Sequence, residues 1–325
     1  MVYIISDSTD ANFNFALEKY AMNDLNIADE YFLFWRTEPT LMIGKFQNAL
    51  QEINMDYVKE NHVNVVRRVT GGGTIYTDMN GWQYSFITKN PKDPRIDFAK
   101  FTQPIIDALS SLGINAELSG RNDLLIDGRK FSGNAQSKTK TMNLHHGSLL
   151  FNTNIEHMVR ALNVADEKIV SKGIKSVRSR VTNIAEHLDQ SLSSEEFQAL
   201  MLDYLTKDMT TYTLRPEDIK AVNLIKAQQF DSWEWNFGKA PKFNITKEQR
   251  YQGGKLTVCS SVNKGILQNI EFYGDFFEQQ DLSQLKDCLI GCQYNEHALH
   301  LALKKVHADN FIYHITLEEI LALII

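Results

Sequence analysis

The sequence predicts an α+β protein with a large N-terminal domain and a smaller C-terminal domain. Strand-like apolar runs alternate with segments of helical periodicity through most of the chain. Beyond residue 244 the pattern changes to two strand-like runs followed only by helical segments, which is typical of a separate unit with strands first and helices after. A chain of 325 residues is long enough to build two hydrophobic cores. We therefore expect one domain over residues 1–243 and another over residues 244–325.

The predicted elements of the first domain follow from local spacing. Apolar residues recurring every three to four positions predict two helices, one over residues 13–21 and one over residues 101–112, where Pro104 leaves the start uncertain. The turn pair Asp127-Gly128 between two short apolar runs predicts a β-hairpin. Apolar or β-branched runs predict further strands over residues 31–35, 63–66, 82–87 and 149–152.

The C-terminal part begins with a β-hairpin and ends with a helix. Residues 233–243 are rich in Trp, Gly and Pro and lack periodicity, so we expect a linker there. Two alternating runs then flank Asn263-Lys264-Gly265, which indicates a hairpin. Thr316 and Glu319 have the spacing of a helix capping box, so the final apolar segment is predicted to be a core helix.

Composition excludes several classes of protein. The net charge of -6 gives no general attraction to nucleic acid or to an anionic membrane. The three cysteines are too few and too unevenly spaced for a disulfide framework, and we expect free thiols. The N-terminal residues lack the pattern of a signal peptide, and no apolar stretch is long enough to cross a membrane. We therefore expect a cytoplasmic protein.

The segment RRVTGGGTIYTD, residues 67–78, is the most informative in the chain. Three consecutive glycines after a strand allow backbone N–H groups to approach and cradle a phosphate. Arg67 and Arg68 are placed to neutralise that phosphate. A flexible turn beside two surface arginines explains the same residues. The chain lacks both the P-loop pattern and the GxGxxG dinucleotide pattern.

The segment SGRNDLLIDGRKFSGNAQ, residues 119–136, offers a candidate cation and a candidate metal site. Lys130, predicted to begin a strand, has the charge needed to bring a carboxylate and an α-phosphate together. Asn122 and Asp123 carry the oxygen ligands that Mg²⁺ prefers alongside phosphate and water. A solvated lysine is the alternative interpretation.

Two further segments carry potential ligand contacts. His145 and His146 are adjacent on a predicted strand, so they point to opposite faces and do not readily share one metal. One of them can reach a ligand while the other is structural; two structural histidines is the alternative. Residues 171–184, SKGIKSVRSRVTNI, form a basic stretch that suits a loop closing over an anion, or a solvated charged loop.

Taken together and in order along the chain, these segments closely resemble the lipoate–protein ligase family. The resemblance also includes HHGSLLFN, WNFGKAPKFN and GGKLTV…NIEFYGDFF. It implies a mixed sheet flanked by helices, as in biotin ligases, with a small α+β accessory domain at the C-terminus. It implies an enzyme that uses ATP to convert lipoate to lipoyl-AMP, releasing pyrophosphate, and then transfers the lipoyl group to a carrier lysine. The implied carriers are a glycine-cleavage H-like protein or an acyltransferase lipoyl domain, and the expected state is a monomer.

The resemblance also assigns roles to individual residues. Lys130 is the expected catalytic residue and should contact both the lipoate carboxylate and the adenylate. Gly72 and His146 are expected to contact lipoate, and Asn122 and Asp123 to lie near Mg²⁺. The residues expected to contact ATP or the adenylate are Arg68, Gly73, Thr74, Ile75, Tyr76 and Lys130.

The sequence departs from the family pattern just after the glycines. Thr77 replaces a histidine that the family usually has, and Asn80-Gly81 reverses the usual Gly-Asn order. Threonine reaches less far than histidine and carries no charge near neutral pH. We expect either that the surface here is retuned for a restricted set of carriers, or that the change is neutral drift.

Competing functions are an octanoyl or lipoyl transferase and a lipoate-binding regulatory paralogue with reduced turnover. The transferase chemistry considered uses a cysteine nucleophile, whereas the three cysteines here lie after residue 258. A biotin ligase would need a Gly-Arg-Gly-Arg loop, which is absent. Retention of the arginine, the glycines and Lys130 favours the active ligase.

Overall fold

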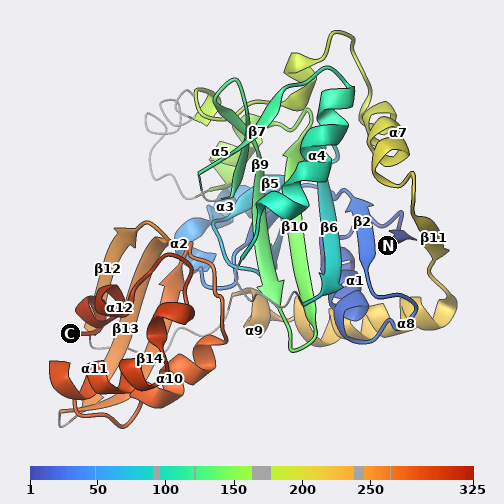
Figure 1. Ribbon diagram of the computed structural model, residues 1–325. Helices are drawn as coiled ribbons and strands as arrows, with labels where there is room; N and C mark the ends of the chain where they lie inside the picture. The colour runs from blue at the N-terminus through green and yellow to red at the C-terminus, as the bar shows by residue number, and fades with distance from the viewer. Residues whose placement is uncertain (48, 91–95, 121, 163–176, 238–244, 264) are drawn as a thin grey trace.

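The computed structural model describes the chain except residues 48, 91–95, 121, 163–176, 238–244 and 264. Within the described residues, an eight-stranded sheet runs in the order β11-β1-β2-β6-β10-β9-β8-β7 (Figure 1). The first three strands pair in parallel and the others pair antiparallel, so the sheet is mixed. Its strands are β1 (Val2–Ile5), β2 (Tyr31–Trp35), β6 (Gly81–Lys89), β7 (Ala116–Ser119), β8 (Asp123–Ile126), β9 (Arg129–Lys138), β10 (Met142–Leu150) and β11 (Thr210–Thr213).

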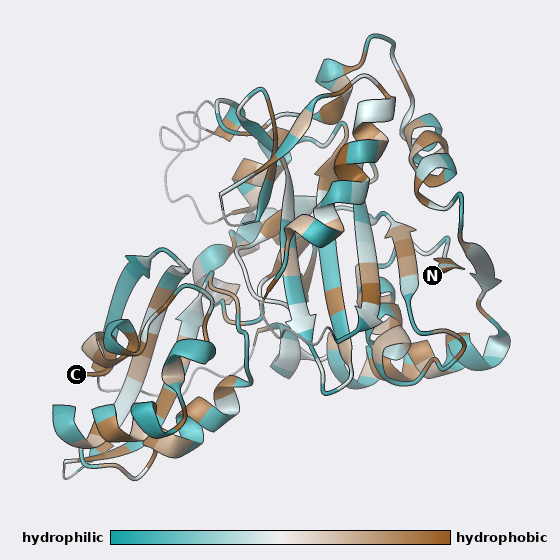
Figure 2. Ribbon diagram, viewed as in Figure 1, coloured by the Kyte–Doolittle hydropathy of each residue, from teal (hydrophilic) through white to brown (hydrophobic). Residues whose placement is uncertain are grey.

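Helices cover both faces of this sheet, which explains why β2 and β10 are buried along their whole length. On one face lie α1 (Ala11–Asn23) and α8 (Pro216–Ile225), continued by a π-helical turn (Lys226–Phe230). On the other lie α4 (Ala99–Ser111) and α7 (Ser194–Leu205). Figure 2 shows the hydrophobic residues gathered along β2, between the two helical layers.

A second, small sheet positions the glycine segment. It has the order β4-β3-β5, formed by β4 (Asn64–Arg67), β3 (Thr40–Ile43) and β5 (Ile75–Thr77). The glycines lie in the connection from β4 to β5. Four short helices accompany this region and the chain that follows: α2 (Ala49–Glu52), α3 (Met55–Glu60), α5 (Ile155–Ala161) and the 3-10 turn Ile184–His187.

The C-terminal unit has its own sheet, helices and hydrophobic core. Its antiparallel sheet contains β12 (Ile245–Tyr251), β13 (Gly254–Asn263) and β14 (Ile266–Gly274). The capping box at Thr316 and Glu319 begins the last helix as predicted, with both hydrogen bonds formed. The helices packed on this sheet are α10 (Leu282–Leu289), α11 (Glu296–Lys305), a 3-10 turn (Ala308–Asn310) and α12 (Leu317–Ile324).

Most predicted elements are present, and two need correction. The linker predicted over residues 233–243 is wrong at its start, because Trp233–Asn236 form helix α9 packed against β4; residues 238–244, where the domain boundary was expected, lie outside the described residues. The strand predicted over residues 149–152 is the end of the longer β10, which stops at Leu150. Pro104 lies inside α4. No helix among the described residues has the length and apolar character needed to span a membrane.

The two units make direct contacts beside the glycine segment. The Gly72 N–H donates to the Phe276 carbonyl at 3.0 Å, and the Gly274 N–H donates to the Phe46 carbonyl at 2.7 Å. The rings of Phe46 and Phe276 stack with centroids 4.7 Å apart. Lys45 forms an ion pair with Glu278. The C-terminal unit therefore rests on the segments that flank the candidate site.

Candidate active site

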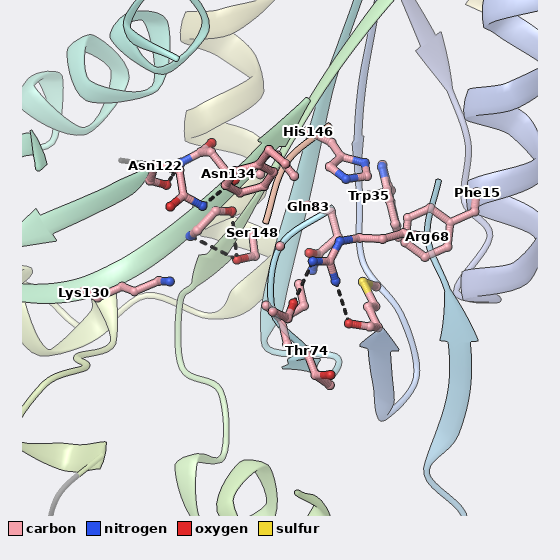
Figure 3. Close-up of a pocket in the computed structure, with 18 residues that line it drawn as sticks. Phe15, Trp35, Arg68, Thr74, Gln83, Asn122, Lys130, Asn134, His146 and Ser148 are labelled. Atoms are coloured by element: carbon pink, nitrogen blue, oxygen red, sulfur yellow. Dashed lines mark hydrogen bonds between the residues drawn. The ribbon is translucent and has the colours of Figure 1, made fainter. Parts of the chain in front are cut away.

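A cavity of about 110 Å³ lies between the main sheet and the glycine segment (Figure 3). Lys130 lies at one end, and Phe15, Trp35 and His146 lie at the other. The structure brings together most of the residues that the sequence singles out. Those that line the cavity are Arg68, Gly72, Gly73, Thr74, Ile75, Asn122, Lys130 and His146.

Two predicted residues do not line this cavity. Tyr76 follows Ile75 on β5, so its side chain points to the opposite face of the strand, where it packs with Leu41 and Ile43. Asp123 instead contacts Lys130, with its Oδ1 2.7 Å from the lysine Nζ. Tyr76 could therefore contact a nucleotide only through its backbone. Asp123 could act only through its ion pair with Lys130.

Arg68 is a buried support for the glycine segment. Its guanidinium donates to the carbonyls of Gly71 and Gly73 at 2.9 and 2.7 Å. It also donates to the Met42 carbonyl and the Thr70 hydroxyl. Burial, with a smaller effect of the neighbouring positive charge, lowers its pKa to about 9, so it remains charged at neutral pH. Arg68 thus shapes the segment from within and presents positive charge to the cavity.

Arg67 does not point toward a phosphate, which corrects the sequence interpretation of the arginine pair. Its Nε donates to the Trp235 carbonyl and its Nη2 to the Asn236 carbonyl, both at 2.9 Å. Its Nη1 donates to the carbonyls of Gly44 and Gln47. Consecutive strand residues face opposite sides, so only one of the two arginines can face the cavity. Arg67 clamps α9 to the loop after β3.

The glycines let the backbone of the C-terminal unit approach the backbone of the glycine segment closely. A Cβ built on Gly71 would lie 2.2 Å from the Phe276 carbonyl oxygen. Gly72 has φ +90°, a conformation that L side chains rarely adopt, and its N–H is bonded to Phe276. The predicted cradle of N–H groups is therefore partly occupied in this arrangement by the C-terminal unit.

His146 joins a buried polar network at the apolar end of the cavity. Its Nδ1 lies 3.1 Å from Glu18 Oε1, and its Nε2 lies 2.7 Å from the Thr70 hydroxyl. The Ser85 hydroxyl donates to Glu18 at 2.6 Å, and Trp35 Nε1 donates to Ser85 at 3.1 Å. Buried polar groups need such partners, because an unpaired one costs about 1–3 kcal/mol. The network fixes the orientation of the cavity-facing imidazole.

His145 points to the opposite face of β10, as the alternation of strand residues predicts. It is fully buried and stacks on Phe101. Burial holds its pKa well below the ordinary value, so it is neutral. Gln136 Nε2 lies 3.0 Å from His145 Nδ1, and His145 Nε2 lies 3.1 Å from Asn134 Oδ1. His145 therefore supports Asn134, which lines the cavity.

Lys130 is held at the mouth by backbone pairing and by Asp123. Its N–H donates to the Arg180 carbonyl at 2.8 Å, and its carbonyl accepts from the Thr182 N–H at 2.9 Å. This bridge ties β9 to the end of the predicted basic segment, whose first part, residues 171–176, lies outside the described residues. The Asn122 side chain donates to the Asn134 carbonyl at 2.6 Å. We call Lys130, its ion-pair partner Asp123 and the adjacent Asn122 the polar group at the mouth.

Thr77 is buried, which argues against the expectation of a retuned carrier surface at this position. It is 2% exposed, and its hydroxyl accepts a 2.8 Å hydrogen bond from Gln83 Nε2. Gln83 lines the cavity. A Cβ on Gly81 would lie 3.0 Å from the Thr77 hydroxyl, so the space around it is full. Thr77 acts on the cavity through Gln83.

Sequence reasoning missed several residues that line or support the cavity. Phe15 from α1 and Trp35 from β2 supply apolar walls, and Glu18 supports His146. Phe277 reaches the cavity from the C-terminal unit. No local motif marks these residues. The spacing of apolar residues predicts the helix that contains Phe15, but it does not indicate which distant residues that helix contacts.

Comparison with known families places both parts of the chain in one group. Residues 10–206 match the "Lipoyl protein ligase A/B catalytic domain" family. Residues 240–324 match the "Bacterial lipoate protein ligase C-terminus" family. The two matches have the same order as the two structural units.

Similar proteins extend over nearly the whole chain. The lipoate-protein ligase LplJ of Bacillus subtilis (strain 168) is 42% identical over 320 residues, covering 97% of each chain. Lipoate–protein ligase 1 of Staphylococcus aureus (strain Mu50 / ATCC 700699) is 36% identical, again covering 97% of each.

Solved structures share the fold, and one of them extends over nearly the whole chain. The P. falciparum LipL1 structure in complex with lipoate has a TM-score of 0.76 at 25% identity and covers 94% of each chain. A lipoate-protein ligase A structure bound with ATP has a TM-score of 0.62 at 21% identity, covering 73% of this chain and 98% of that one, and so shares the fold. With two family matches in order and relatives of more than 30% identity along its length, the chain belongs to the lipoate–protein ligase family.

Proposed function

We propose that this protein is an ATP-dependent lipoate–protein ligase. It activates lipoate with ATP to give lipoyl-AMP and pyrophosphate, and it then transfers the lipoyl group to a lysine of a carrier protein. The observation that carries the proposal is a single cavity with an apolar end and a cationic mouth. Phe15 and Trp35 line the apolar end together with Met42, which belongs to the same hydrophobic cluster, and Lys130 lies at the mouth.

This arrangement matches an acid with a long apolar tail. The acyl chain and its terminal ring lie against the aromatic walls, where burying apolar surface contributes roughly 25 cal/mol per Å². The carboxylate then reaches the Lys130 ammonium. His146 and the Gly72 backbone contact the buried part of the acid. Family membership and the lipoate bound to a relative of the same fold support this placement.

Lys130 serves the two half-reactions in the same way. In the first, a lipoate carboxylate oxygen attacks the α-phosphorus of ATP and pyrophosphate leaves. In the second, the carrier lysine amine attacks the acyl carbon, AMP leaves, and the amine proton passes to solvent. Both transition states carry negative charge between the carboxyl and phosphoryl groups, which a fixed ammonium stabilises. The Asp123 carboxylate keeps the ammonium positioned.

The nucleotide lies along the glycine segment and the polar group at the mouth. Arg68 supplies positive charge from behind the segment, and Gly73, Thr74, Ile75 and Tyr76 offer backbone and side-chain contacts. Thr74 presents a hydroxyl whose bond to Gln47 holds its rotamer.

Magnesium fits beside Lys130. Mg²⁺ in nucleotide sites takes one or two carboxylates and otherwise phosphate oxygens and water. Asp123, 38% exposed, and the neighbouring amide of Asn122 provide that set. When bound, the ion neutralises the charge on the phosphates.

A lipoyl domain or an H-like protein is the proposed acceptor, and its lysine would enter at the mouth where Lys130 lies. The fold is shared with an archaeal ligase whose structure was solved as a lipoylation system with its E2 lipoyl domain. Action in the cytoplasm and as a monomer remain predictions.

The transferase alternative lacks a cysteine nucleophile among the described residues of this cavity. None of the described residues that line it is a cysteine. Cys259, on β13, and Cys288, on α10, belong to the C-terminal unit. Burial raises the pKa of Cys288 to about 11, which disfavours the reactive thiolate.

The deciding experiment measures pyrophosphate release by the purified protein. ATP with lipoate should give pyrophosphate, and ATP alone should give none. Adding a lipoyl domain should then convert its lysine to the lipoylated form. Carrier modification from an acyl-carrier thioester without ATP would instead identify a transferase, and lipoate binding without pyrophosphate would identify the regulatory paralogue.

A further inference from the structure

Phe277 belongs to the C-terminal unit, yet it lines the cavity of the large domain. It lies in the connection between β14 and α10, after the residue whose carbonyl accepts the Gly72 N–H. We propose that Phe277 determines which acids the enzyme accepts, by closing the acyl cavity with a ring that moves with the C-terminal unit. This inference rests on the proposed function.

Several contacts hold the ring in place. Phe277 packs with Phe98 and Ala135 of the large domain, and its ring centroid lies 5.5 Å from that of Phe98. A Cβ built on Gly72 would lie 3.0 Å from Phe277 Cε1. The Tyr313 N–H donates to the Phe277 carbonyl at 2.9 Å. The ring is therefore wedged between the glycine segment and β9.

The inner part of the cavity is small compared with the acid proposed to enter it. An apolar cavity of about 150 Å³ accommodates one benzene, and a lipoyl group has about twice as many heavy atoms. The cavity here measures about 110 Å³. A wall that withdraws would therefore let more of the lipoyl group enter the inner part of the cavity.

The wall that can withdraw is the one attached to the other unit. Phe15, Trp35 and Phe277 are all buried, but Phe15 and Trp35 belong to the core of the main sheet, whereas Phe277 belongs to the other unit. Phe277 contacts the large domain through its ring, and the carbonyl of the preceding Phe276 accepts the Gly72 N–H. Withdrawal of residues 276–277 enlarges the cavity and releases the Gly72 N–H for a phosphate oxygen. The enzyme therefore selects acids by how well the ring closes over them.

The test measures how three acids bind the full-length protein. Calorimetry with lipoate, octanoate and an octanoate carrying a phenyl ring at its far end gives three affinities for each variant. Phe277→Ala should raise the affinity for the phenyl acid relative to lipoate by roughly tenfold or more, the scale on which pocket contacts discriminate. Gly71→Ala should act in the same direction without altering Phe277, because its Cβ would meet the Phe276 carbonyl at 2.2 Å.

Tyr313→Leu is the matched control. Tyr313 packs on Phe98 in the same interdomain cluster but does not line this cavity, so its replacement removes a neighbouring ring while leaving the Phe277 ring and the Phe276–Gly72 hydrogen bond in place. The proposal expects its ratio of affinities to equal that of the unmodified protein. An unchanged ratio in Phe277→Ala, or an equal rise in Tyr313→Leu, overturns the role of Phe277 while lipoate-dependent pyrophosphate release preserves the proposed function. If no acid binds the unmodified protein, both fail together.

Discussion

Replacing Lys130 with methionine separates catalysis from stability. Methionine keeps an unbranched apolar stem and removes the ammonium. Loss of one preorganised donor typically costs 10²–10³ in kcat, or about 3–4 kcal/mol of transition-state stabilisation. We therefore expect lipoate-dependent pyrophosphate release to fall by roughly 100-fold or more.

The same substitution should barely change the free energy of unfolding. The side chains of Lys130 and Asp123 are 35% and 38% exposed, and such pairs contribute about 0–1 kcal/mol after solvent screening. The contacts of Lys130 with Arg180 and Thr182 use only its backbone, so they survive. Urea unfolding should show a change below about 1 kcal/mol.

Two further variants make the result interpretable. Lys138→Met, at the far end of β9, removes an equivalent charge outside the cavity and should leave turnover unchanged. Asp123→Asn removes the partner carboxylate and should raise the magnesium concentration needed for half-maximal rate. Turnover of Lys130→Met close to that of Lys138→Met would refute the assignment. Alternatively, Asp123→Asn loses as much turnover as Lys130→Met without a change in the magnesium requirement. That result would mean that Lys130 serves only to position the Asp123 carboxylate.

Three other perturbations test the buried network, the acid stability and the departure from the family pattern. Glu18→Leu leaves His146 Nδ1 and the Ser85 hydroxyl without their partner, so we expect urea unfolding to show a loss of about 1–3 kcal/mol and calorimetry to show weaker lipoate binding. Undiminished binding would contradict the network's role. Hydrogen bonds from neighbouring hydroxyls and an arginine hold the pKa of Asp218 well below its ordinary value, so its stabilisation is present above about pH 4 and is lost as pH falls toward the depressed pKa. Unfolding of Asp218→Asn should accordingly differ most from the unmodified protein near pH 7 and least near pH 2, whereas a constant difference would exclude this linkage. Thr77→His overfills a buried site and removes the hydrogen bond to Gln83, so it should lower the free energy of unfolding and weaken lipoate binding. The relative rates of transfer to different carriers should stay equal. A change confined to carrier preference would instead support the explanation of a retuned carrier surface.

Much of the fold could be predicted because its signals are local. The spacing of apolar residues around Phe15 indicates a helix, and the run from Tyr31 to Trp35 indicates a strand, because side chains repeat every 3.6 and 2 residues in these elements. The segment Trp233–Asn236 misled prediction because its backbone carbonyls accept hydrogen bonds from the guanidinium of Arg67, which is 166 residues earlier in the chain than Trp233. A short helix stabilised by such a distant partner has no periodicity of its own.

By itself the sequence determined the fold class, the family and the segments that meet at the cavity. Those features depend on residue types at short spacing, such as the three glycines after Arg68 and the lysine that begins β9. Strand alternation also separated His145 from His146.

Only the tertiary structure decided what each side chain contacts. Arg67 and Arg68 are neighbours of identical type, yet one clamps α9 and the other supports the glycines. Glu18 meets His146 across 128 positions of sequence, and Phe277 enters a cavity built by another domain. Such contacts arise because a buried charge or ring is placed by whichever distant groups satisfy its hydrogen bonds and fill its volume, and the sequence around it does not encode that choice.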